Sequence, residues 1–142
     1  MESKRPSMHV SEITVRGYEC DFYRHVNNAV YINYLEHARS EYLRERGFDL
    51  FELRDVQKVM LVVVRNEINY RLPAAKNDVL EIHSTISKLG GGSCTFRQEI
   101  VRKEGGLLIA DALVTWASVN LETGKATRIP ESLREMLVRE LG

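Results

Sequence analysis

This sequence has few cysteines and no excess of charge of one sign, and each of these features excludes a class of protein. The two cysteines, Cys20 and Cys94, lie far apart and form no C-x-x-C pattern, so no disulfide framework is indicated. Twenty basic residues are matched by twenty acidic ones, giving a formal net charge of zero, whereas nucleic-acid-binding domains usually carry a basic surplus. We therefore expect a reduced, cytoplasmic protein that binds no nucleic acid.

Long apolar runs and flexible linkers are missing as well. The longest strongly apolar run, Val59 to Val64, is far too short to span a bilayer. Residues Met1 to Pro6 lack the apolar core of a signal peptide. No Pro/Gly/Ser-rich stretch and no internal repeat divides the 142 residues, and this length is typical of one domain. The expectation is a single soluble domain over residues 1–142, without a membrane span.

What the sequence does contain is a strand-like segment followed by a long helical one. His9 to Tyr18 alternates between apolar and polar residues, as a strand does. From Asn28 to about Arg46 the apolar residues recur at steps of three and four, which predicts a helix with one apolar stripe. Gly47 is a plausible stop for this helix. The stripe consists of Tyr31, Tyr34, Leu35, Ala38, Tyr42 and Leu43.

The rest of the chain is mainly strand-like. Phe48 to Val56 is ambiguous, with a short helical turn as one interpretation. Four long strands are then predicted before an amphipathic helix that opens at Pro130. The order predicts an α+β fold, in which one helix covers one face of an antiparallel sheet of about five strands. The second face and the edges then need cover, so we expect an oligomer. The strands are predicted over Val59–Tyr70, Val79–Lys88, Cys94–Arg102 and Leu107–Asn120.

Polar residues gather at the join between the first strand and the long helix. Asp21 is suited to act as a general base or nucleophile, and His25 could orient a carbonyl group or a water molecule. A helix that begins near Asn28 presents unpaired N–H groups that can stabilise an oxyanion. The alternative is structural, since Asp and Asn before a helix are common caps. Asn27 is well placed for a cap, whereas Asp21 lies too far ahead of the helix.

This stretch resembles the hotdog-fold acyl thioesterases. The resemblance is carried by the run Asp21-x-x-x-His25-Val26-Asn27-Asn28-x-x-Tyr31 and by Glu36-x-x-Arg39. It is closest to bacterial acyl-CoA thioesterases of the hydroxybenzoyl-CoA class, and the His-Val-Asn-Asn segment is also similar to plant acyl-carrier-protein thioesterases. It implies a long central helix wrapped by a bent antiparallel sheet, and hydrolysis of a thioester without a metal or cofactor. It also implies a homodimer or homotetramer.

The resemblance also implies roles for single residues. Asp21 falls where the hydroxybenzoyl-CoA type keeps its catalytic carboxylate, and Asn28 where that type offers a helix N-terminal amide to the thioester oxygen. His25 matches the plant-type histidine. Two departures are visible: Arg24 and His25 stand where the first type has a small residue followed by an aliphatic one, and Tyr23 stands where the plant type has Asn.

Further candidates lie outside this stretch. Glu36 is a second catalytic candidate, because some hotdog thioesterases place a Glu on the helix; the alternative is an ordinary surface pair with Arg39. Coenzyme A phosphates need cations, and Lys88 is the first choice. Weaker choices are Arg65, Arg102 and Lys103. Tyr23, Val62 and Val63 could line an acyl or aryl pocket, although the two valines are better explained as sheet core. His37 and Tyr34 are interpreted as helix surface and core.

Two other functions stay open. Hotdog hydratases and dehydratases also act on acyl thioesters, but they carry an Asp and a His separated by Asn-Pro, which Tyr23-Arg24 does not supply. A non-catalytic acyl-CoA sensor would normally carry a separate DNA-binding segment, for which no residues are left over. The predicted activity is acyl-CoA thioester hydrolysis, with a carrier-protein thioester as the alternative substrate.

Overall fold

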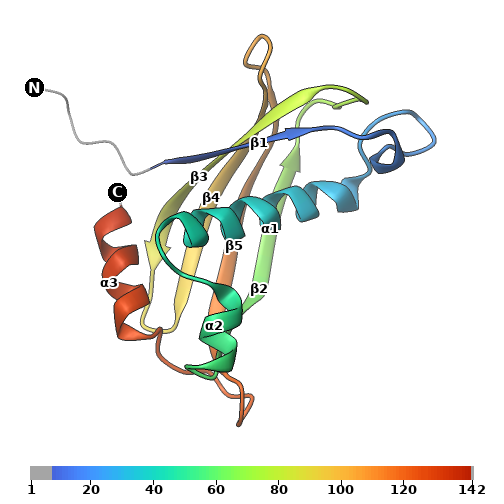
Figure 1. The fold of residues 1–142 in the computed structure, drawn as a ribbon. Coiled ribbons are helices and arrows are strands. Elements are labelled where there is room, and N and C mark those ends of the chain that lie inside the picture. Colours follow the sequence, from blue (N-terminus) through green and yellow to red (C-terminus); the bar gives the residue numbers. More distant parts are fainter. Residues whose placement is uncertain (1–7, 142) are drawn as a thin grey trace, which may run out of the picture.

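The computed structural model describes residues 8–141 and contains one antiparallel sheet with helices on one side of it (Figure 1). The strands are ordered β1-β3-β4-β5-β2, with β1 and β2 at the two edges. The long helix α1 lies along one face of the sheet, so the predicted α+β architecture is confirmed. The elements are β1 (His9–Thr14), α1 (Asn28–Glu45), α2 (Leu50–Asp55), β2 (Val59–Tyr70), β3 (Val79–Leu89), β4 (Ser93–Arg102), β5 (Leu108–Asn120) and α3 (Glu131–Glu140).

Local sequence explains where α1 begins and ends. The Oδ1 atom of Asn27 accepts a hydrogen bond from the N–H of Ala29 (2.9 Å), so Asn27 is the N-cap that the sequence indicated. After the last turn, Gly47 adopts a φ of 88°, a left-handed conformation that glycine tolerates best. The predicted apolar stripe of α1 is buried against the sheet.

The core forms where this stripe meets the alternating inward residues of the strands. Near the C-terminal half of α1, the ring of Phe96 lies 5.2 Å from that of Tyr42 and 6.2 Å from that of Trp116, measured between centroids. Leu133, Met136 and Leu137 of α3 close this end of the core. The strand alternation therefore fixes which face of the sheet receives α1.

The first strand ends earlier than predicted. Residues 17–19 form a short 3-10 turn instead of continuing to Tyr18. The carboxylate of Glu19 holds this turn, because it accepts hydrogen bonds from the backbone and guanidinium of Arg16 and from the hydroxyl of Tyr34 (3.0 Å). A buried tertiary contact thus overrides the alternating pattern at this position.

The prediction that Val62 and Val63 belong to the sheet core is wrong. These residues are 39% and 40% exposed, because among residues 8–141 β2 pairs only with β5 and its other edge is free. The register shifts between Val63 and Arg65, which leaves Val64 as an extra, 61% exposed residue. An open, β-branched edge of this kind is a liability that proteins usually cover.

The sheet face that points away from α1 is polar, which changes one part of the oligomer argument. It carries the partly exposed side chains of Glu81, His83 and Glu99 and the exposed side chain of Arg97. Such a face does not need an apolar cover, so the edge at β2 is the stronger reason to expect a partner. Within residues 8–141, no helix is long and apolar enough to cross a membrane.

Candidate active site

Asp21 and His25 lie in one tight loop between the 3-10 turn and α1. The N–H of Asp21 donates to the carbonyl of His25 (2.7 Å), and the N–H of Arg24 donates to the carbonyl of Asp21 (2.9 Å). Oδ1 of Asp21 accepts from the N–H groups of Tyr23 (2.8 Å) and His25 (3.4 Å). One carboxylate oxygen therefore organises the loop, while within residues 8–141 the other makes no hydrogen bond.

Asn28 is the first residue of α1, directly after the Asn27 cap. In the part of the chain that the structure describes, the N–H of Asn28 has no hydrogen-bond acceptor, while its carbonyl accepts from the hydroxyl of Tyr70 (3.3 Å). The side chains of Asp21, His25 and Asn28 are all exposed. A free N–H at the positive end of a long helix can donate to an anionic oxygen.

The interpretation of Glu36 and Arg39 as an ordinary surface pair is wrong, because Arg39 is not on the surface. Its guanidinium is buried and donates from Nη1 to Oε1 of Gln98 (3.0 Å). Gln98 in turn donates from Nε2 to the carbonyl of Leu35 (3.1 Å) and to Oγ of Ser84 (3.0 Å). Burial lowers the pKa of Arg39 to about 10, against the opposing influence of the Glu36 charge. The sequence signs of this network are Gln98 in the apolar alternation of β4 and Ser84 in that of β3.

Glu36 itself is exposed and borders a cavity of about 210 Å³ between α1 and β2. Val63 and Trp116 line the same cavity, with Arg39 in its wall. Val63 therefore fits the pocket-lining interpretation rather than the core one. Glu36 lies eight residues after Asn28 on α1, or about 12 Å along the helix axis.

Lys88 is not close to Asp21 within one chain. The Asp21 loop packs against the N-terminal side of β3, since His25 bridges to Ala75 and the N–H of Val26 donates to the carbonyl of Ala74. Lys88 is exposed near the opposite end of β3, roughly 30 Å from Val79 at a rise of about 3.3 Å per residue. The weaker cation candidates have acidic partners: Arg65 with Glu67, Arg102 with Asp78 and Lys103 with Glu12.

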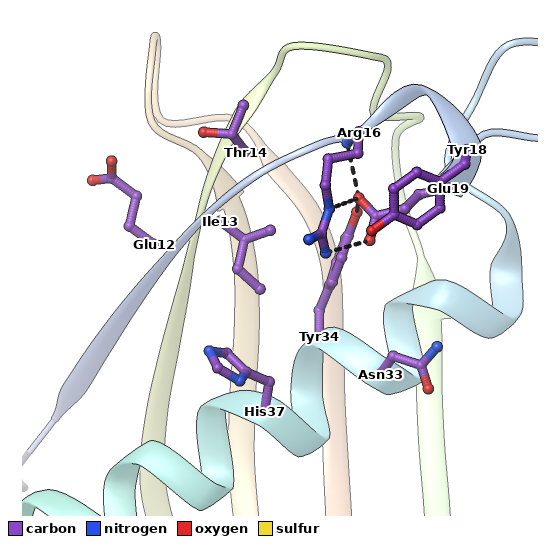
Figure 2. Close-up of a pocket in the computed structure, with 9 residues that line it drawn as sticks. All are labelled: Glu12, Ile13, Thr14, Arg16, Tyr18, Glu19, Asn33, Tyr34 and His37. Atoms are coloured by element: carbon purple, nitrogen blue, oxygen red, sulfur yellow. Dashed lines mark hydrogen bonds and ion pairs between the residues drawn. The ribbon is translucent and has the colours of Figure 1, made fainter.

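A groove of about 710 Å³ runs between β1 and α1 and includes none of the predicted catalytic residues (Figure 2). Tyr34 is buried at its base, where burial and the Glu19 carboxylate raise the pKa of the Tyr34 hydroxyl. His37 lies on the exposed flank of α1. The interpretations of Tyr34 as core and His37 as surface are confirmed. The groove itself depends on how β1 packs against α1, which no local pattern indicates.

Comparison with known proteins decides the family. The model of the thioesterase-like superfamily matches residues 15–137. This chain belongs to that superfamily. It is similar to the long-chain acyl-CoA thioesterase FadM of Escherichia coli (strain K12), with 41% identity over 127 residues that cover 89% of this chain and 95% of the relative. The family assignment and the assignment to the thioester hydrolases are confirmed.

Two further relatives are informative. The chloroplastic acyl-acyl carrier protein thioesterase ATL3 of Arabidopsis thaliana is 28% identical over 135 residues, covering 94% of this chain and 69% of the relative. The crystal structure of YbaW, a probable thioesterase from Escherichia coli, matches with 39% identity and a TM-score of 0.79, covering 94% of this chain and 98% of that one. The predicted hotdog architecture of this thioesterase-like chain is confirmed.

Proposed function

We propose that this protein hydrolyses acyl-CoA thioesters to a free acid and coenzyme A. One observation carries the proposal: among residues 8–141, one oxygen of the Asp21 carboxylate and the N–H of Asn28 at the start of α1 both lack a hydrogen-bond partner, and they are close in sequence. The similarity to an acyl-CoA thioesterase supports coenzyme A as the thiol, and that to a carrier-protein thioesterase makes acyl-carrier protein the alternative.

The reaction adds water to the thioester carbon and expels the thiol. Asp21 acts as the general base that takes a proton from water, or as the nucleophile that attacks the carbonyl. The N–H of Asn28 and the dipole of α1 stabilise the negative charge that develops on the carbonyl oxygen. His25 lies on the same loop and orients the carbonyl or the water. Glu36 is the second candidate base, supported by its place beside a cavity.

Free-thiol release tests this function directly. With a panel of short-chain, long-chain and aromatic acyl-CoAs and an acyl-carrier-protein thioester, we expect thiol to appear at the rate at which free acid forms. A hydratase would change an unsaturated acyl group without releasing thiol. An acyl-CoA sensor would bind thioesters and release no thiol from any of them. Either result would remove the proposed function.

We also propose that the protein is a homodimer in which the free edge of β2 pairs with β2 of a second copy. The support is that the twelve-residue edge strand β2 has no partner on its outer edge among residues 8–141, and that its exposed Val63 lines the cavity beside Glu36. Phe22 and Tyr23, on the Asp21 loop, are 94% and 76% exposed, more than such large aromatic side chains usually are. Pairing would bury these surfaces and bring a second chain to the site. A tetramer would be a pair of such dimers.

Lys88 then serves the active site of the other subunit, because it lies far from Asp21 in its own chain. We expect Lys88→Ala to raise the KM for acyl-CoA several-fold and to leave kcat unchanged, since the lost contact is to phosphates remote from the reacting bond. A shortened acyl-pantetheine thioester, which lacks the nucleotide phosphates, should show no such increase.

Mixed dimers separate the two possible placements of Lys88. A heterodimer of one Lys88→Ala chain and one Asp21→Asn chain, isolated with two different tags, contains one intact Asp21. If Lys88 serves the partner's site, that Asp21 is matched with an intact Lys88, and the KM returns to the wild-type value. If the KM stays high, Lys88 serves its own chain's site. If no heterodimer or homodimer forms, the dimer proposal is wrong.

A further inference from the structure

A second group of chemically active side chains lies between the start of β1 and the end of α1, away from Asp21 and Asn28. The two elements lie side by side and run in opposite directions (Figure 1). His9, Glu41 and Glu45 each bring one potential ligand atom, and these atoms all lie within 4.8 Å of one another. Glu41 is thirteen residues after Asn28 on α1, about 20 Å along the helix, so this cluster is separate from the candidate active site.

His9 is the unusual member of the cluster. Its side chain is 4% exposed, and both ring nitrogens lack a hydrogen-bond partner among residues 8–141. Nε2 of His9 lies 2.9 Å from Oε2 of Glu45, but this contact does not have the geometry of a hydrogen bond. A buried polar group without hydrogen bonds is costly. The buried imidazole of His9 therefore lies next to the Glu45 carboxylate without a hydrogen bond to compensate for its loss of contact with water.

Of the two acids in the cluster, Glu41 is held by Ser11 and His37, whereas Glu45 is poorly compensated. Glu41 and Glu45 are one turn apart on α1, where like charges repel. Glu45 is the last residue of the helix, so its negative charge lies at the negative end of the helix dipole, which is unfavourable. A divalent cation between them would remove both penalties and would also take up a ring nitrogen of His9.

Neighbouring residues orient Glu41 in the way that hydrogen-bonding residues around a metal site orient its ligands. Oε2 of Glu41 accepts from Oγ of Ser11 (2.6 Å), and Oε1 lies 2.6 Å from Nε2 of His37. A carboxylate has four lone-pair positions, so these contacts orient Glu41 and still leave room for a metal. Ligand atoms of a tetrahedral zinc site lie about 3.4 Å apart. The ligand atoms of the cluster lie within 4.8 Å of one another, close to this spacing, and the 58% exposed side chain of Glu45 has room to adjust.

We propose that His9, Glu41 and Glu45 form a binding site for a divalent transition-metal ion of the zinc type, with His37 orienting Glu41. Imidazole and carboxylate groups are the ligand types that Zn²⁺ accepts. The metal would link the edge strand β1 to the last turns of α1. Its consequence is structural: it stabilises this corner of the fold and takes no part in thioester hydrolysis.

Zinc binding by the full chain tests the site, with any affinity tag removed and the protein stripped with EDTA. We expect calorimetry to show one Zn²⁺ bound per chain and a higher Tm in the presence of Zn²⁺. Co²⁺ should give the visible bands of nitrogen and oxygen ligands without a thiolate charge-transfer band, which excludes Cys20 and Cys94 as ligands. No binding, or a thiolate band, would refute the proposal.

Matched variants locate the metal. His9→Gln and Glu45→Gln should each weaken Zn²⁺ binding at least tenfold and remove the rise in Tm. His83→Gln is the control, because His83 also lies beside a carboxylate, that of Glu81 (3.1 Å), but outside the cluster; it should bind Zn²⁺ as the wild type does. Glu45 is exposed, so Glu45→Gln should fold whatever happens to His9→Gln. If Glu45→Gln retains wild-type affinity, the assignment is wrong.

Discussion

Asp21→Asn is expected to lower kcat for thioester hydrolysis by a hundredfold or more while leaving the Tm almost unchanged. A positioned general base contributes about 10²- to 10⁴-fold to rate, and an amide can neither accept the proton nor attack the carbonyl. The substitution is close to isosteric. Its side-chain oxygen can still accept the loop hydrogen bonds from Tyr23 and His25, so the loop should keep its shape. Thiol-release kinetics and thermal unfolding on the same samples provide the measurement.

This variant separates catalysis from loop structure. Asp21→Ala removes both the charge and the loop hydrogen bonds. The difference in Tm between Asp21→Ala and Asp21→Asn therefore measures how much those hydrogen bonds stabilise the fold. Glu36→Gln is the catalytic control: a comparable fall in kcat would make Glu36 a second essential carboxylate. Wild-type turnover by folded Asp21→Asn, with activity lost only in Glu36→Gln, would transfer the base to Glu36.

Asn28→Pro is expected to lower kcat by about a hundredfold to a thousandfold, the usual effect of deleting one oxyanion donor. Proline lacks the N–H but suits the first position of a helix, where that N–H has no helical partner. The preceding residue must be extended, and Asn27 already has φ −64° and ψ 140°. The substitution therefore deletes the proposed donor without breaking α1. Kinetics and the far-UV helix signal should be measured together.

Asn28→Ala is the matched control, because it removes the side chain but keeps the backbone N–H. We expect Asn28→Ala to retain most of the activity and Asn28→Pro to lose it. Equal loss in both variants would point to the Asn28 side chain instead of the amide. Full activity in Asn28→Pro would show that the oxyanion is stabilised elsewhere.

The elements of this fold were largely predictable because their signals are local. The β2 segment was predicted at the boundaries that it has, and α1 within one residue of its end. The predictions failed where the conformation of a residue depends on a contact with a residue distant in sequence. The chain turns after β1 because Glu19 accepts a hydrogen bond from Tyr34 of α1, and Arg39 points inward because it donates to Gln98 of β4. Neither partner is adjacent in sequence, so no periodicity shows the pairing.

The sequence by itself determined the fold class, the cap at Asn27 and the family, since the polar run from Asp21 to Asn28 and the two hydrophobic periods are all short-range patterns. Tertiary structure alone decided three other features: the exposure of Val63 beside the Glu36 cavity, the separation of Lys88 from Asp21, and the meeting of His9 with Glu41 and Glu45. The physical reason is the same for each. Strand order, the packing of the sheet against α1 and the place where the Asp21 loop meets the sheet decide which side chains come together, and none of these is encoded in a local pattern.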